Sequence, residues 1–233
     1  MTILLTDDIV LTEDDFKTIS RAVYDHCGIN LHMGKKELVR ARMAKLLRQK
    51  GFRSFSDYIR FVMNDRSGAE FTVLIDALST NLTSFFRENQ HFDYLRTSLL
   101  PQLLARRSHG GKTRIRGWSA GCSSGEEHYS IAITLLESLP ASGTVDAMIL
   151  ATDIANSKLD IARKGSYDSA KVEPVPADIR LKYFVKTAKR SSAEYELCAA
   201  VKNLVCFRYL NLMEPWPVKG PIDFIFCRNS VFD

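Results

Sequence analysis

The spacing of apolar residues changes once along this chain of 233 residues, between about residues 80 and 101. Before that stretch, apolar residues recur every three or four positions, which is the spacing of helices that bury one face. Beyond it, short apolar runs alternate with helical patterns, which is typical of a parallel sheet with helical crossovers. The spacing therefore predicts an all-helical domain over residues 1–80 and an α/β domain over residues 81–233.

Four helices are expected in the first domain, and capping residues indicate where several of them begin and end. Thr12 is suited to cap a first helix that ends at Gly28, and a second helix over 35–50 stops at Gly51. Ser54 opens a third helix, and a fourth begins near residue 69. The side chains expected to face inward are Phe16, Ile19, Val23, Leu38, Met43, Leu46, Leu47, Tyr58, Ile59, Phe61, Val62, Phe71, Leu74, Ile75 and Leu78.

Five strands and two helices are expected in the second domain. The run 147–152 (AMILAT) is almost wholly apolar, as are strands that are buried on both faces of a parallel sheet. The expected strands are 113–120, 147–152, 194–200, 202–207 and 222–227, and the expected helices are 126–139 and 157–164.

Composition excludes several classes of protein. With 45% hydrophobic and 25% charged residues, the chain is neither collagen-like nor a low-complexity disordered segment. No apolar run approaches the roughly 20 residues that cross a bilayer, and no signal peptide is expected. The five cysteines include no Cys-x-x-Cys pair, which argues against a disulfide framework or a zinc site. We therefore expect a cytoplasmic protein that holds no metal.

The charges are unevenly distributed along the first domain. Residues 1–30 carry six acidic and two basic side chains, whereas residues 35–53 carry eight basic side chains and one acidic one. A basic block beside an acidic one suits either a charged docking surface or an ordinary solvated helix face.

A glycine-bracketed turn at 118–127 (WSAGCSSGEE) lies between an expected strand and an expected helix. In open α/β sheets, ligands bind at the carboxyl ends of the strands, so this turn is where we expect a ligand. A dinucleotide site is rejected because Gly117, Gly121 and Gly125 do not have the Gly-x-Gly-x-x-Gly spacing. Moreover, Glu126 and Glu127 open the helix where a pyrophosphate needs positive potential.

The same turn matches the Gly-x-Ser-x-Gly pattern of hydrolases, with Ser123 at its centre. A catalytic triad with the serine first needs a histidine later in the chain, and only His128 follows within residues 124–233. His128 is five residues away in the first turn of the next helix, where it cannot reach Ser123 with triad geometry. Unless residues beyond 233 supply a histidine, the hydrolase reading fails.

S-adenosylmethionine suits the turn best. This ligand carries a sulfonium, an ammonium and a ribose diol but no phosphate, so it needs carboxylates and close backbone approach. Glu127 can receive the ammonium or a hydroxyl, and Asp153, at the end of the next strand, can accept from the ribose hydroxyls. Each residue also has an ordinary structural role, Glu127 in a first helical turn and Asp153 at a helix cap, but together on successive strand ends they favour a site.

Five segments match a known family in order and approximate spacing: 81–88 (NLTSFFRE), 118–130 (WSAGCSSGEEHYS), 151–154 (ATDI), 211–212 (NL) and 226–229 (FCRN). Through them the chain resembles the bacterial chemotaxis receptor methyltransferases of the CheR type, which methylate receptor glutamates. The resemblance runs from about residue 12 to residue 229. It implies an N-terminal helical receptor-docking domain and a Rossmann-like methyltransferase domain with a small antiparallel β-subdomain at about 183–207.

The resemblance also implies a set of site residues. Arg87 is the best candidate for a catalytic residue, which would hold the acceptor carboxylate or shape the methyl pocket. Phe85 and Phe86 are expected in the core, and Asn81 and Thr83 would otherwise be turn and cap residues before a helix at Ser84. The implied cofactor contacts are Asn81, Thr83, Arg87, Glu127, Asp153, Asn211, Leu212, Arg228 and Asn229.

The chain departs from the family pattern in two places. His128 stands where the family usually has proline, at a helical position that tolerates either. The family also continues beyond Arg228 and Asn229 with a tyrosine near the transferring methyl and with further strands, so the sheet is expected to stop after its fourth strand. The alternative to an active enzyme is therefore a catalytically impaired module that binds the cofactor or docks on receptors.

The expected reaction is the attack of a glutamate carboxylate on the sulfonium methyl of S-adenosylmethionine, which leaves S-adenosylhomocysteine. The expected partner is the cytoplasmic helical region of chemoreceptors, which suits the basic block. Nucleic acid is disfavoured because Phe52, Phe55 and Tyr58 read as helix core rather than as a stacking platform. No membrane insertion is expected, and the chain is expected to be a monomer.

Overall fold

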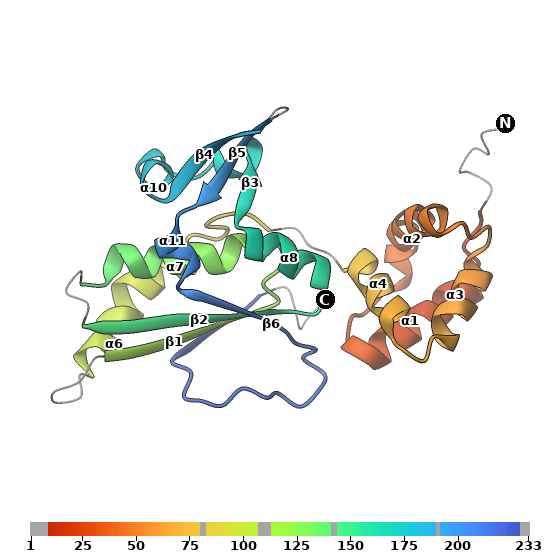
Figure 1. The fold of residues 1–233 in the computed structure, drawn as a ribbon. Coiled ribbons are helices and arrows are strands. Elements are labelled where there is room, and N and C mark those ends of the chain that lie inside the picture. The colour runs from red at the N-terminus through yellow and green to blue at the C-terminus, as the bar shows by residue number, and fades with distance from the viewer. Residues whose placement is uncertain (1–8, 80–82, 107–112, 141–143, 190–191, 229–233) are drawn as a thin grey trace. The chain divides into compact units, whose positions relative to one another are not determined.

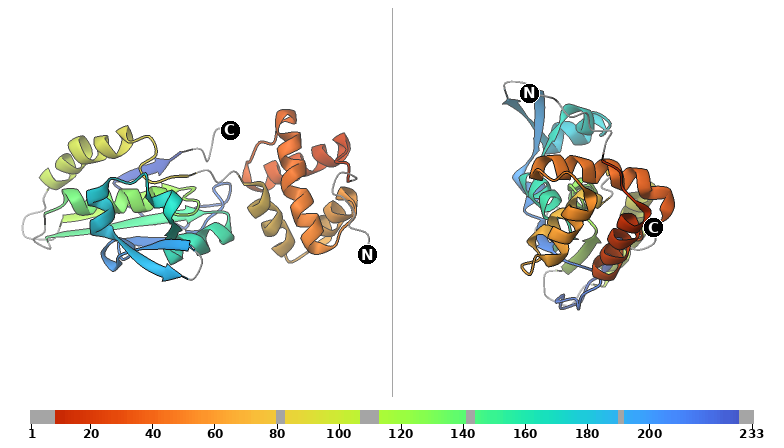
Figure 2. Two further views of the ribbon diagram at one scale, coloured as in Figure 1. Left: turned by 90° about the horizontal axis from the view of Figure 1, so that it is seen from above. Right: turned by 90° about the vertical axis from the view of Figure 1, so that its right-hand side faces the viewer.

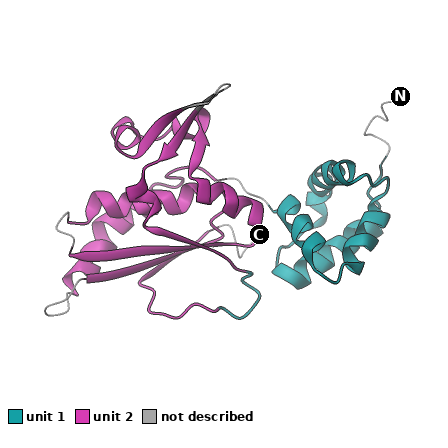
Figure 3. Cartoon of the chain, in the orientation of Figure 1, with its two compact units in different colours: residues 1–80, 211–216, 231–233 teal, residues 81–210, 217–230 magenta. Residues whose placement is uncertain are grey.

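The computed structural model describes residues 9–79, 83–106, 113–140, 144–189 and 192–228. The chain forms two compact units, which Figure 3 shows in different colours. The first comprises residues 1–80, 211–216 and 231–233, and the second comprises residues 81–210 and 217–230. Residues 211–216, which follow the strand β6 (Val205–Tyr209) in the sequence, are therefore grouped with the helical unit.

The first unit is helical, as expected (Figure 1). Thr12 and Ser54 each accept a hydrogen bond from the backbone N–H three residues on, and Gly28 and Gly51 end helices in the left-handed conformation. These local caps explain why the expected boundaries are confirmed within a few residues. The elements are α1 (Glu13–Cys27), the 3₁₀ turn η1 (Met33–Lys35), α2 (Lys36–Lys50), α3 (Phe55–Asn64) and α4 (Ala69–Leu78).

Two expected core residues of the helical unit are exposed instead. Leu38 has 42% of its surface accessible and Phe61 has 44%. In α2 the buried face begins at Val39 and continues through Met43 and Leu47, so Leu38 lies one position outside it. Phe61 packs its ring against Phe52 near the surface. Apolar residues just beside a helix face are hard to assign from spacing alone.

A four-stranded parallel sheet forms the centre of the second unit, with strand order β6-β2-β1-β7. The helices α7 and α8 pack on this sheet, as Figures 1 and 2 show. The elements are α5 (Gln90–Tyr94), the π-helical stretch η2 (Leu95–Leu99), α6 (Leu100–Ala105), β1 (Thr113–Ala120), α7 (Glu126–Ser138), β2 (Val145–Asp153), α8 (Asn156–Lys164), β6 (Val205–Tyr209) and β7 (Phe224–Cys227).

A smaller antiparallel sheet has the strand order β3-β5-β4. Its strands are β3 (Ser166–Asp168), β4 (Phe184–Lys189) and β5 (Ser192–Leu197), and the short helices beside it are α9 (Ser169–Val172), α10 (Ala177–Tyr183) and α11 (Ala199–Lys202).

The expected range of the β-subdomain, 183–207, is wrong at both ends. The small sheet also contains β3, which is too short to show a period in the sequence. The expected strand 194–200 ends at Leu197, because α11 follows it, and the expected strand 202–207 is β6, which pairs with β2 in the parallel sheet. The last expected strand begins at Phe224 rather than at Ile222. A helix at Ser84 is also wrong, since α5 begins at Gln90.

The register of the parallel sheet brings the carboxyl ends of β1 and β2 side by side, with Ala120 opposite Thr152. Gly117 is needed in β1 because a Cβ there would lie 2.4 Å from the Phe224 ring. The described helices include none that is both long and apolar enough to span a membrane.

Candidate functional site

The turn after β1 has an unusual backbone. Gly121, Ser123 and Gly125 all have positive φ, at 74°, 48° and 112°. The positive φ of Ser123 is the unusual one, because a non-glycine residue rarely adopts this conformation. The N–H groups of Gly121 and Cys122 both donate to the Thr152 carbonyl at the end of β2. The turn is therefore held against the neighbouring strand.

Asp153 joins the two strand ends. It is 7% exposed, and its Oδ2 accepts from the Ser123 N–H at 2.7 Å while its Oδ1 accepts from the Ala155 N–H at 2.8 Å. The first of these bonds holds the left-handed Ser123 in place. A carboxylate oxygen accepts more than one hydrogen bond, so the same side chain is suited to a ligand hydroxyl.

Glu126 anchors the small sheet to the turn. Its side chain is fully buried, accepts from Ser124 Oγ at 2.7 Å and forms an ion pair with Lys171 of α9. Tyr167 of β3 donates its hydroxyl to the Ser124 carbonyl at 2.9 Å. A Cβ on Gly125 would lie 2.4 Å from that hydroxyl, so only glycine leaves room for it. The Glu126 side chain therefore has a structural role, since Ser124 and Lys171 bind both of its carboxylate oxygens.

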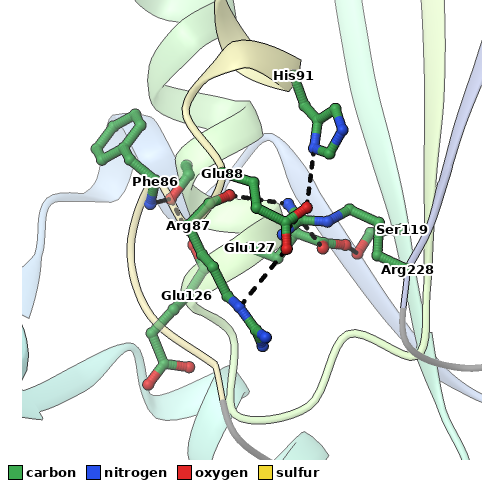
Figure 4. Close-up of polar contacts among 9 residues, drawn as sticks. Phe86, Arg87, Glu88, His91, Ser119, Glu126, Glu127 and Arg228 are labelled. Carbon is green, nitrogen blue, oxygen red and sulfur yellow. Dashed lines mark hydrogen bonds and ion pairs between the residues drawn. The ribbon is translucent and has the colours of Figure 1, made fainter.

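Glu127 faces the other way, toward a group of charged side chains (Figure 4). Its Oε1 accepts from Ser119 Oγ at 2.8 Å, and its Oε2 lies 3.6 Å from Nη1 of Arg228, which follows β7. Burial raises the pKa of Glu127 above its ordinary value, even though the Ser119 hydrogen bond and Arg228 both lower it. A buried carboxylate in this condition is stabilised by a further cation.

The loop before α5 completes the group. Phe86 and Glu88 both have left-handed backbones, with φ of 52° and 57°. The Phe86 N–H donates to Ser130 Oγ of α7 at 2.9 Å, which ties the loop to the helix that carries Glu127. Arg228 Nη1 donates to the Arg87 carbonyl at 3.0 Å. Residues from the loop, α7 and the end of β7 therefore meet at one place.

Glu88 is a member of this group that sequence reasoning missed. Its carboxylate lies 3.2 Å from Arg228 Nη2, 3.8 Å from Arg87 Nε and 3.6 Å from His91 Nδ1. The sequence around Glu88 offered no signal of these contacts, because neither its left-handed backbone nor its distant partner Arg228 is encoded in a local pattern.

His128 and Ser123 do not form a catalytic pair. His128 is fully buried, and within the described residues neither ring nitrogen has a hydrogen-bond partner. Its ring contacts the rings of Tyr129 and Phe207, and burial lowers its pKa to about 3. It is therefore a neutral core residue, which agrees with the rejection of a hydrolase.

The structure brings some of the expected site residues together and not others. Arg228 contacts both Glu127 and the Arg87 carbonyl, so these three residues lie together. Asp153 lies at the end of β2 and binds the turn after β1. Thr83 is half-buried in the loop before Arg87. Asn81 and Asn229 lie outside the described residues. Asn211 and Leu212 belong to the first unit, where the Asn211 amide donates to the His26 carbonyl at 2.7 Å.

Comparisons with known proteins agree with this architecture. Residues 14–79 match the family model "CheR methyltransferase, all-alpha domain", and residues 81–232 match "CheR methyltransferase, SAM binding domain". A probable chemotaxis protein methyltransferase of Rhizobium etli is 41% identical over 209 residues, which is 90% of this chain and 77% of that protein. A chemotaxis protein methyltransferase of Borreliella burgdorferi is 39% identical over 224 residues, which is 95% of this chain and 78% of that protein.

Proposed function

The chain belongs to the CheR methyltransferase family, which uses S-adenosylmethionine as methyl donor, and we propose that it methylates glutamate carboxylates on chemoreceptors. The observation that carries the proposal is the position of two carboxylates near the carboxyl ends of neighbouring strands: Asp153 ends β2, and Glu127, in the first turn of α7, accepts a hydrogen bond from Ser119 of β1. Asp153 is buried and Glu127 is only 14% exposed, and a ligand that is cationic and rich in hydroxyl groups suits two such carboxylates.

The donor set fits S-adenosylmethionine. Glu127 is a desolvated carboxylate with a raised pKa, so a ligand ammonium would supply the positive charge that burial makes necessary. Asp153 would accept from the ribose hydroxyls while keeping its bonds to the Ser123 and Ala155 N–H groups. The other contacts that we propose are Asn81, Thr83, Arg87, Asn211, Leu212, Arg228 and Asn229.

S-adenosylmethionine supplies an electrophilic methyl group when it is bound. The acceptor glutamate has a reference pKa of about 4.3 and is already ionised at neutral pH, so no general base is needed. The task left to the protein is to bring the carboxylate into line and to exclude water. We assign Arg87 to the acceptor carboxylate. The interaction of Arg87 with the acceptor carboxylate has to be moderate in strength. Strong stabilisation of the ionised carboxylate in the ground state would slow a reaction in which that carboxylate loses its charge.

The basic face of α2 is the proposed receptor-docking surface. Lys45 and Arg48 are exposed and Arg40 is partly so. Arg42 is different, because its guanidinium donates to the Leu78 carbonyl at the end of α4. Reversal of charge at Arg40, Lys45 and Arg48 should therefore weaken binding to an acidic receptor fragment in a salt-dependent manner, while Arg42 is best left intact to keep the helices packed.

Incubation with methyl-labelled S-adenosylmethionine and a receptor helical fragment tests the proposal. We expect label in the fragment that is released by base, as a carboxyl methyl ester is, and no transfer when the receptor glutamates are replaced by alanine. Label that resists base would contradict glutamate methylation. Cofactor binding without any transfer would instead support the docking or cofactor-binding module.

A further inference from the structure

The Arg228 guanidinium lies between two carboxylates of the second unit. Its Nη2 is 3.2 Å from Glu88 Oε2, and its Nη1 is 3.6 Å from Glu127 Oε2 (Figure 4). The side chain of Arg228 is only 13% exposed, so its electrostatic interactions are weakly screened. The closer of the two acidic partners is Glu88, which is 42% exposed, and the more distant is Glu127, which is 14% exposed.

The position of Glu88 is built into the loop. Its φ of 57° is uncommon for a non-glycine residue and is maintained only where the surroundings hold it. Two hydrogen bonds hold the loop next to Glu88. The Phe86 N–H donates to Ser130 Oγ, and Arg228 Nη1 donates to the Arg87 carbonyl at 3.0 Å. The same hydrogen bond fixes the direction of the Arg228 fork.

This arrangement matters for Glu127. An arginine with a single carboxylate within reach tends to pair with it in a bidentate manner. Among the described residues, the other carboxylate within 4 Å of Arg228 is Glu127, already at 3.6 Å. Without Glu88, we expect Arg228 to close this pair and to neutralise the partly buried Glu127 charge more fully. A cationic ligand would have to displace that pair before it could bind.

We propose that Glu88 is a positioning residue that draws the Arg228 guanidinium toward itself, limits its pairing with Glu127 to the longer 3.6 Å contact, and so leaves the Glu127 carboxylate available to the ligand ammonium. The inference rests on the proposed role of Glu127 in cofactor binding. Among the described residues, Arg87 and His91 are the other basic groups near Glu88, at 3.8 Å and 3.6 Å, and Glu127 is a like charge that interacts with it.

Binding of S-adenosylhomocysteine to the full chain, measured by calorimetry, tests the inference without any methyl transfer. Glu88→Gln keeps the shape and the backbone preference of the side chain but removes its charge. We expect the dissociation constant to rise about tenfold. Glu88→Asp restores the charge and should recover part of the affinity.

Asp93→Asn is the matched control. It removes a carboxylate of similar exposure, 49%, from the neighbouring helix α5, where Asp93 pairs with Arg96. We expect its affinity to stay within about twofold of the native value, with an unfolding midpoint close to that of Glu88→Gln. Equal loss of affinity in Glu88→Gln and Asp93→Asn would overturn the inference, because the loss would then follow from the removal of any nearby negative charge.

A double-mutant cycle separates action through Arg228 from direct action. In an Arg228→Met background, Glu88→Gln should change the dissociation constant by less than about twofold, since no guanidinium remains to be released. A full tenfold effect in that background would contradict the inference. Glu127→Gln tests the proposed function itself: unchanged affinity there would remove Glu127 from the site, whereas lost affinity there with no effect of Glu88→Gln would overturn the inference alone.

Discussion

The helical unit and the site of the second unit differ in how they hold their backbones. Among the described residues of the helical unit, those with a left-handed backbone are the glycines 28, 51 and 68, which adopt this conformation without strain. Within the described residues, the non-glycine residues with positive φ are Phe86, Glu88 and Ser123, and all of them lie at the site. Local rules therefore govern the first region, and contacts between distant segments maintain strained residues in the second.

Gly125→Ala should have the largest effect and breaks the comparison at its strongest point. The new Cβ would meet the Tyr167 hydroxyl at 2.4 Å on a backbone with φ of 112°. We expect a loss of about 3 kcal/mol in the free energy of unfolding and loss of S-adenosylhomocysteine binding. Gly51→Ala is the control from the helical unit: its φ is 78° but no atom lies within 4 Å of the added Cβ, so about 1 kcal/mol is expected. If urea unfolding showed the same loss of stability for Gly125→Ala and Gly51→Ala, the contrast between the two regions would be contradicted.

Asp153→Ala removes the contact that holds Ser123. The buried N–H groups of Ser123 and Ala155 would lose their acceptor, which should cost about 2 kcal/mol of stability. The loss of a proposed ribose acceptor should add an increase of about 30-fold in the dissociation constant for S-adenosylhomocysteine. Calorimetry measures the second effect, and an unchanged constant would remove Asp153 from the cofactor site.

His128→Phe tests the buried neutral histidine. Since the folded-state pKa is lowered to about 3 from an ordinary 6.5, the unfolded chain binds the proton more readily. Stability from this group is complete above pH 6.5 and is lost as pH falls toward 3, by about 2 kcal/mol at pH 5. The variant should lose this acid sensitivity when urea unfolding is compared at pH 7.5 and 5. Replacement of the exposed His32 in the helical unit serves as control and should leave the acid sensitivity of the stability unchanged.

Ser54→Ala should have the smallest effect and sharpens the local side of the comparison. The Ser54 hydroxyl caps α3 by accepting from the Asp57 N–H at 3.0 Å. Its loss should cost about 1 kcal/mol in thermal or urea unfolding. Affinity for S-adenosylhomocysteine should not change, and a change would mean that the cofactor site depends on the cap of α3.

Local signals in the sequence were sufficient for the helices and for the main strands. Thr12, Gly28 and Gly51 mark helix ends through contacts within four residues, and Thr113–Ala120 reads as a strand over its full length. The turn between β1 and α7, with Glu127 on the helix and Asp153 after the next strand, was also recognisable because its chemistry repeats a known spacing. The family follows from these elements.

Only the tertiary structure placed Glu88 beside Arg228, residues that are 140 positions apart, and turned Glu126 toward Lys171 while its neighbour Glu127 faces Ser119. It also decided that β6 joins β2 rather than the small sheet. The physical reason is the range of the forces involved. Caps and helix faces depend on neighbours along the chain, whereas ion pairs, strand pairing and a left-handed residue such as Ser123 depend on partners that only folding brings together.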